Sequence, residues 1–145
     1  MKYSEIKHLK SFCESLHSEP NWREVLENIL SGDSDFEVDN VRFISSSEID
    51  AIQCEELESD LYILGCFNAW FIADILGIDQ DVIEAMQQAE AFEAIGKLIV
   101  SMGKLEELQA EYSRMDGYGH HFNHYDSNEE EIHIDGDSYH VFDNH

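Results

Sequence analysis

An almost wholly apolar run, residues 61–76, constrains the fold of this chain more than any other stretch. Thirteen of its sixteen residues are apolar, and a helix that is apolar on nearly all faces lies either in a membrane or at the centre of a core. The run is shorter than the ~20 residues that a bilayer requires. It also contains Asn68 and Asp74, and Gly77 follows it. The sequence therefore predicts a soluble protein built around a central helix over residues 61–76.

Helical periodicity predicts further helices on both sides of this run. Apolar residues recur at three-to-four-residue spacing over residues 4–17, 20–32 and 48–59, and again over residues 79–102 and 104–114. Ser4, Ser47 and Asp79 are candidate N-cap residues, because short polar side chains accept hydrogen bonds from the first free amides of a helix. We expect about five to six helices in all.

Two other stretches alternate apolar and polar residues around a turn dipeptide, residues 36–44 around Asp39-Asn40 and residues 131–142 around Asp135-Gly136. This pattern predicts two short antiparallel β-hairpins, which can pair with each other. The fold class expected is α+β, mainly α. A length of 145 residues indicates a single domain. It would comprise a helical body over residues 4–115, then a His-rich loop and the C-terminal hairpin over residues 116–145.

The charge of the chain excludes several classes of partner. There are 32 acidic and 8 basic residues, for a formal net charge of −24, and the acidic residues are spread along the whole chain. Such a surface repels nucleic acid and anionic membranes, and it attracts a protein with a basic groove. The expected partner is therefore a basic nucleic-acid-binding protein, with no direct binding to nucleic acid or membrane. The oligomeric state stays open.

Carboxylates on two of the predicted helices are the candidate contacts with this partner. Duplex DNA presents one charge per ~1.7 Å of its axis, so rows of carboxylates on rigid helices can occupy the same Lys and Arg side chains. The candidate partner-binding residues are Asp50, Glu55, Glu56, Glu58, Asp60, Asp81, Glu84 and Glu90.

Residues 72–86 also reproduce the spacing of a helix-turn-helix, with Ala73, Gly77 and Ile83 at the small, glycine and apolar positions. In that motif the second helix contacts bases and phosphates in the major groove. Here the second helix presents Asp81 and Glu84, which repel phosphates. We interpret the spacing as a packing solution for two helices rather than as a DNA-reading motif.

Six of the eight histidines lie in the last 26 residues. His120, His121, His124 and Asp126 are of the residue types that bind Zn²⁺. Their spacing matches no established metal motif, so we expect no metal and no cofactor, and we expect the His and aromatic side chains to fold a loop back onto the core. No catalytic motif stands in the chain, so we do not expect an enzyme. A metal-dependent hydrolase that uses these four residues is an alternative.

The cysteines indicate the compartment. Cys13, Cys54 and Cys66 are odd in number and widely spaced, which favours reduced thiols and a cytoplasmic protein. The basic N-terminal residues are followed by no apolar region or cleavage site, so no signal peptide is expected.

The stretch Phe67-Asn-Ala-Trp-Phe-Ile-Ala-Asp74 and the segment Asp116-Gly-Tyr-Gly-His-His-Phe-Asn-His-Tyr-Asp126, followed by Ser138-Tyr-His-Val-Phe142, resemble small acidic proteins of phages and other mobile elements. In overall charge the chain is similar to antirestriction and anti-CRISPR proteins that imitate DNA. These resemblances imply an inhibitor that occupies the nucleic-acid groove of a host restriction enzyme or CRISPR effector. The alternative is a small globular protein whose acidity serves only solubility or adaptation to salt.

Overall fold

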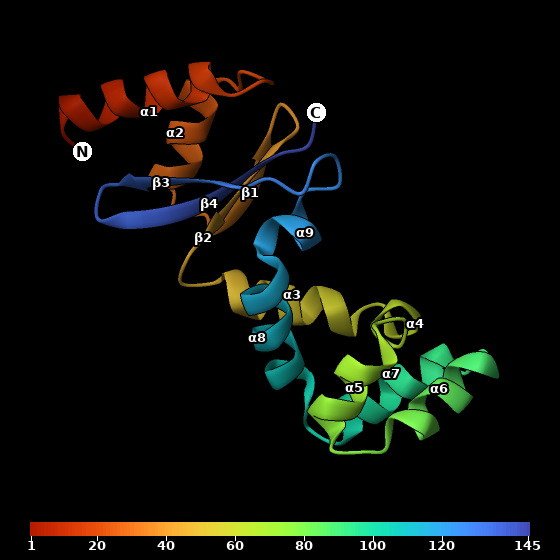
Figure 1. The fold of residues 1–145 in the computed structure, drawn as a ribbon. Helices are drawn as coiled ribbons and strands as arrows, with labels where there is room; N and C mark the ends of the chain where they lie inside the picture. Colours follow the sequence, from red (N-terminus) through yellow and green to blue (C-terminus); the bar gives the residue numbers. More distant parts are fainter. The chain divides into compact units, whose positions relative to one another are not determined.

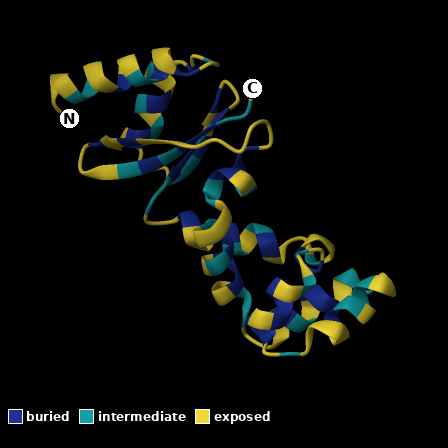
Figure 2. Ribbon diagram, in the orientation of Figure 1, coloured by how far each residue is buried: buried dark blue, intermediate teal, exposed yellow.

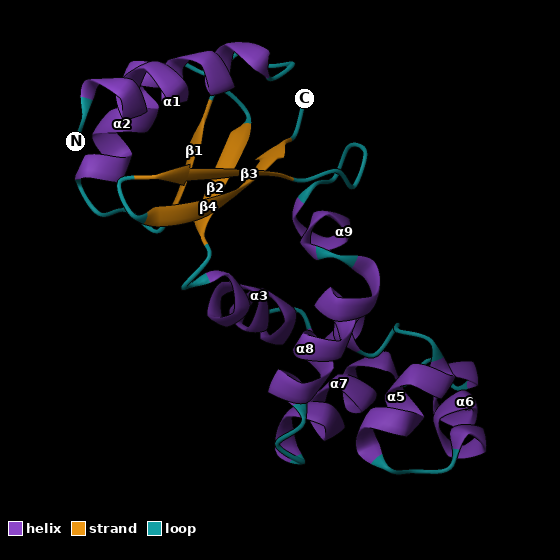
Figure 3. Cartoon of the chain, turned by 60° about the vertical axis from the view of Figure 1, so that its left-hand side comes forward, coloured by secondary structure: helices purple, strands orange, loops and turns teal.

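The computed structural model describes residues 1–145, and it contains nine helices and one four-stranded antiparallel sheet (Figures 1 and 3). The predicted α+β, mainly helical class is confirmed. The chain forms two compact units, which we call the sheet unit (Met1–Ile49 with Asp116–His145) and the helical unit (Asp50–Met115). The single domain expected for residues 1–145 stays a prediction.

Both predicted hairpins are present, and they pair with each other to form the sheet. The strands are β1 (Asp35–Val38), β2 (Val41–Ser45), β3 (Glu130–Ile134) and β4 (Asp137–Asp143), in the order β1-β2-β4-β3. Asp39, Asn40 and Asp135 adopt positive φ angles of 50°, 69° and 52° in the two turns. Asn and Asp tolerate this conformation better than other side chains do. Central pairing of β2 with β4 brings the two ends of the sequence into one unit.

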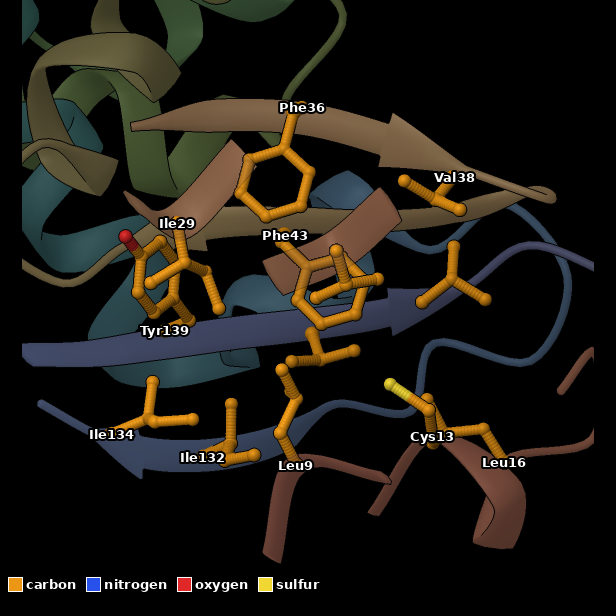
Figure 4. Close-up of a cluster of buried hydrophobic side chains, with 13 residues drawn as sticks. Leu9, Cys13, Leu16, Ile29, Phe36, Val38, Phe43, Ile132, Ile134 and Tyr139 are labelled. Atoms are coloured by element: carbon orange, nitrogen blue, oxygen red, sulfur yellow. The ribbon is translucent and has the colours of Figure 1, made fainter. Parts of the chain in front are cut away.

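Helices α1 (Tyr3–Ser15) and α2 (Trp22–Leu30) cover one face of the sheet. Figure 4 shows Leu9 and Cys13 of α1 pointing toward Phe43 of β2, and all three side chains are at most 1% exposed. Burial raises the pKa of the Cys13 thiol to about 12, so it stays protonated. Burying a side chain of the size of Leu or Phe contributes about 1.5–3 kcal/mol. This cluster is the core of the sheet unit, and it appears as the dark blue stretches of these elements in Figure 2.

The opposite face of the sheet carries a short helix, α9 (Tyr118–Phe122), where the sequence predicted a loop. Side chains alternate along a strand, so Arg42 and Phe142 point away from α1 and α2. The ring of Phe122 lies 5.2 Å from that of Phe142, and the Arg42 guanidinium lies 5.0 Å from the Phe122 ring. Arg42 also donates two hydrogen bonds to Asp35, at 2.9 and 2.8 Å. The loop prediction was wrong because burial of Phe122 orders the segment.

Two predicted helix starts were also wrong by one or two residues. Helix α1 begins at Tyr3 rather than after Ser4, and the Glu5 carboxylate accepts a hydrogen bond from the backbone N–H of Lys2 at 3.4 Å. Helix α2 begins after Asn21, whose side chain accepts from the backbone N–H of Arg23 at 3.0 Å. Helices α3 (Ile49–Glu58) and α8 (Leu105–Asp116) lie close to their predicted ranges.

The continuous central helix predicted over residues 61–76 was wrong, because the run is divided into α4 (Leu61–Leu64) and α5 (Ala69–Leu76). Helix α4 crosses α7 (Phe92–Ser101) at very short range: a Cβ atom on Gly65 would lie 1.9 Å from the Phe92 carbonyl oxygen. The chain turns after this crossing, which frees backbone carbonyls. The Gln87 side chain donates to two of them, Gly65 O at 3.1 Å and Phe67 O at 2.8 Å.

The long helix expected over residues 79–102 is likewise two helices, α6 (Gln80–Gln88) and α7. The N-cap role of Asp79 is confirmed, since its side chain accepts from the backbone N–H of Asp81 at 2.9 Å. Glu90 has a φ of 59° and lies in the turn where the chain reverses, which allows α7 to pack on α4. These two breaks and the short helix α9 explain why nine helices replace the expected five to six. None of the nine is long and apolar enough to cross a membrane.

Candidate functional site

Each Lys and Arg side chain of the helical unit forms an ion pair with a nearby glutamate. Lys97 lies 3.6 Å from Glu93 and Lys104 lies 3.1 Å from Glu107. Arg114 lies 2.7 Å from Glu111, and this contact raises the pKa of the guanidinium. Each pair is three or four residues apart, the spacing at which helical side chains meet. The unit therefore has no further Lys or Arg to neutralise its other carboxylates.

Helix α3 and the turn after it carry five of the predicted contact residues. Asp50, Glu55 and Glu58 are exposed, whereas Glu56 is half-buried. Asp60 is exposed and also has a structural role, because its carboxylate caps α4 by accepting from the backbone N–H of Ile63 at 3.1 Å. Asp50 accepts a hydrogen bond from the Gln109 side chain, so Glu55 and Glu58 are the two α3 carboxylates most available to a partner.

The other three predicted contact residues lie on α6 and in the turn after it. Asp81 is exposed in the first turn of α6. Glu84 is half-buried and accepts a hydrogen bond from the Gln80 side chain at 2.9 Å. Glu90 is exposed, but it lies in the turn between α6 and α7 and not on a helical face as expected. Only Asp81 and Glu90 of this group are exposed.

The electrostatic surroundings of Cys54 on α3 include a carboxylate of α8. Burial raises the pKa of the Cys54 thiol, and the carboxylates of Glu106, Asp50 and Glu58 raise it further, in that order. Glu106 is an exposed residue of the first turn of α8. The sequence did not single it out, because its relation to α3 depends on packing between segments about fifty residues apart.

A buried amide network fixes α3 against α8. The Gln109 side chain is 4% exposed and donates two hydrogen bonds of 2.8 Å, one to Asp50 and one to the Gln53 side-chain oxygen. Gln53 is fully buried, and its side-chain nitrogen has no hydrogen-bond partner. The two hydrogen bonds from Gln109 therefore join α3 to α8 through Asp50 and Gln53.

The helix-turn-helix spacing serves packing in the structure. Helix α5 ends at Gly77, which has a φ of 67°, and α6 begins after Asp79. Ala73 and Ile83 are buried in the core of the helical unit. This burial agrees with the interpretation that the spacing serves the packing of two helices. Asp81 is exposed at the start of α6, and its carboxylate would repel the phosphates of DNA.

The four residues of the alternative metal site do not form a metal-binding group. No set of three or more His, Cys, Asp or Glu side chains converges as metal ligands. His120 is exposed on α9, and His121 is half-buried with its ring 4.6 Å from that of Phe122. His124 follows the helix, and the Asp126 carboxylate accepts from Asn123 at 2.8 Å and from the backbone N–H of Asn128 at 3.0 Å.

Added Zn²⁺ tests this alternative. An ion that binds only the folded state raises the melting temperature by mass action. For this protein we expect Zn²⁺ to change the melting temperature little. Differential scanning fluorimetry with and without Zn²⁺ measures the shift. A large increase in melting temperature that disappears in a His120→Ala, His124→Ala double variant would support the metal site instead.

The structure gathers a different set of polar side chains at the end of β4. The Asp143 carboxylate accepts from the Ser18 backbone N–H at 3.0 Å and from the Ser18 hydroxyl at 2.5 Å, and it lies 3.2 Å from His145. The His145 ring lies 4.0 Å from the ring of His17 and 4.1 Å from that of Tyr125. The hydroxyl donates to the carboxylate and not to an imidazole, so this set is not a Ser-His-Asp triad. We interpret it as a structural clasp.

The clasp makes stability depend on pH. Burial opposes ionisation of Asp143, but the hydrogen bonds from Ser18 and the contact with His145 outweigh it and lower its pKa from the usual 3.8. A pKa lowered by folding contributes stability above the unfolded pKa, and this is lost as the pH falls through the folded pKa. We expect Asp143→Asn to reduce the free energy of unfolding by about 1–3 kcal/mol at pH 7.

Urea denaturation at several pH values measures this effect, with Asp137→Asn, an exposed position on β4, as control. The difference in the free energy of unfolding between wild type and Asp143→Asn should be complete above pH 3.8 and should shrink as the pH falls below it. A difference that does not change with pH would contradict the assignment.

Comparison with protein-family models, with curated proteins and with solved structures found no match. The function must therefore be inferred from the residues of this chain and their arrangement.

Proposed function

We propose that the protein is an acidic inhibitor that imitates DNA and binds the basic nucleic-acid groove of a host protein, of the restriction or CRISPR type, in the cytoplasm. The observation that carries this proposal is the distribution of countercharge in the helical unit. Its three basic side chains form ion pairs with glutamates three or four residues away, whereas Glu55, Glu58 and Glu90 are exposed and make no ion pair. These carboxylates are available to the Lys and Arg side chains of a partner.

The placement of Glu55 and Glu58 on a helix that is hydrogen-bonded to α8 supports binding rather than solubility alone. Glu55 and Glu58 lie three residues apart on α3, and the Asp50–Gln109 hydrogen bond holds that helix against α8. Carboxylates on a fixed helix lose less conformational freedom on binding than carboxylates on a mobile tail. Charges that are complementary across an interface also steer the approach of a partner. An acidity that served only solubility or salt adaptation would need neither fixed positions nor a partner.

Capture from a host lysate at low salt tests the proposal. The immobilised protein should retain nucleic-acid-binding proteins, and a short DNA duplex should release them where an equal mass of neutral polymer does not. Mass spectrometry of both eluates identifies what is released. If nothing is retained, or if the neutral polymer releases the same proteins as the duplex, the acidity has no such partner and the solubility interpretation replaces the proposal.

A further inference from the structure

The basic residues of the chain fall into two groups. Five of the eight lie within 4.0 Å of a carboxylate partner, namely Lys10, Arg42, Lys97, Lys104 and Arg114. The other three, Lys2, Lys7 and Arg23, make no ion pair, although acidic residues outnumber basic ones four to one. All three lie on α1, on α2 or at their starts. The positive charge that lacks a carboxylate partner is therefore confined to α1, α2 and their starts in the sheet unit.

A hollow of about 380 Å³ lies in this region. It is lined by one stripe of α1 and by one aromatic side chain of α2: Tyr3, Ile6, Lys7, Lys10, Ser11, Glu14 and Trp22. Residues three, four and seven apart share a face of a helix, which explains why this stripe is continuous. Trp22 is half-buried, and the Arg23 guanidinium lies 4.8 Å from its ring. The hollow thus combines an aromatic wall with ammonium groups.

The lysines and the aromatic rings define the ligand chemistry. Lys7 and Lys10 are one helical turn apart and exposed, and Lys10 is only loosely paired, at 4.0 Å from Glu14. Two ammonium groups at that spacing can share the oxygens of one phosphate group. The rings of Trp22 and Tyr3 offer an apolar surface to a flat ring, and Tyr3 is 79% exposed.

The net charge restricts the size of the ligand. A long polyanion would extend beyond the hollow over a protein with a formal charge of −24 and would be repelled. A small anion lies within about a Debye length, ~8 Å at physiological ionic strength, of the lysines, and screening weakens its repulsion by more distant carboxylates. A volume near the lower end of ~300–1,000 Å³, typical of ligand pockets, also suits a small molecule. We propose that this hollow binds a small aromatic phosphate, in the chemical class of a nucleoside monophosphate.

Fluorescence of Trp22 tests the proposal. Trp70, the other tryptophan, is 49% exposed, so a Trp70→Phe background isolates the Trp22 signal at little cost to the fold. Three probes are titrated: adenosine monophosphate, adenosine and inorganic phosphate. We expect saturable quenching by the monophosphate, and binding of each half-ligand at least about tenfold weaker, because both the ring and the charge contribute.

Matched variants separate a site from general electrostatics. Lys7→Gln should weaken binding of the monophosphate by about tenfold, whereas Lys97→Gln, which removes the same charge from α7, should leave it unchanged. Circular dichroism checks that both variants fold. Absence of saturable quenching, equal affinity for adenosine and its monophosphate, or equal effects of the two variants would each overturn the proposal.

Discussion

Replacing Gly96 by Ala should lower the free energy of unfolding by about 2–3 kcal/mol or more, because it inserts a methyl group between two helix backbones. A Cβ atom on Gly96 would lie 2.1 Å from the Leu61 carbonyl oxygen, and one on Gly65 would lie 1.9 Å from the Phe92 carbonyl oxygen. Backbone atoms of packed helices cannot rotate away as a flexible side chain can. Gly65→Ala should therefore have a similar effect, since both substitutions act on the same crossing of α4 and α7.

Gly103→Ala provides the matched control for these two variants. A Cβ atom there would meet nothing within 4 Å, so only the positive φ of 70° opposes it. That backbone strain costs roughly 1–2 kcal/mol. Urea denaturation of the three variants measures the order of stability. If Gly96→Ala and Gly65→Ala are no less stable than Gly103→Ala, α4 and α7 do not cross closely enough to exclude a methyl group.

Reversing two charges on α3, in a Glu55→Lys, Glu58→Lys variant, should weaken binding to a captured partner by about 100-fold, because like charges then face each other across the interface. Both side chains are exposed. Surface substitutions of this kind change stability by within ~0.5 kcal/mol each. Glu56 is left unchanged because it is half-buried, and Asp60 because it caps α4. Circular dichroism should show an intact fold.

A Glu19→Lys, Glu27→Lys variant changes the net charge equally at exposed positions of the sheet unit. This control variant should keep most of its affinity for the captured partner if the α3 surface is the interface. Equal losses in the two variants would mean that total charge governs binding. An Asp81→Lys, Glu90→Lys variant then reports whether the surface near α6 takes part, and Glu106→Lys reports whether the interface includes α8.

Features set by neighbours in sequence were predictable. The turns at Asp39-Asn40 and Asp135-Gly136, the alternation of their flanking strands and the N-cap at Asp79 depend on residues within a few positions of each other. The exposure of Glu55, Glu58 and Asp81 follows from the amphipathic pattern of their helices in the same way. Local chemistry therefore gave the two hairpins and most of the candidate surface.

Features set by distant segments were not predictable. The sequence of residues 61–76 predicts one helix, but the structure breaks it after Leu64. The break depends on the close approach of Phe92 to Gly65, and Gln87 of another helix stabilises it. The clasp of Ser18 and Asp143 joins residues 125 positions apart. Glu106 lies near Cys54 only because α8 packs against α3. Hydrophobic periodicity predicts which face of a helix or strand is buried, but it does not predict which distant segment packs against that face.

Displacement of duplex DNA tests the central claim most directly. A captured partner is loaded with a fluorescently labelled duplex, and the fluorescence anisotropy is followed as the protein is added. If the acidic helices occupy the nucleic-acid groove, wild-type protein should release the duplex at about equimolar amounts, the α3 charge-reversal variant should not, and rising salt should weaken the displacement steeply. A stable complex of partner, protein and duplex, with the anisotropy unchanged, would show that the protein binds elsewhere and does not imitate DNA.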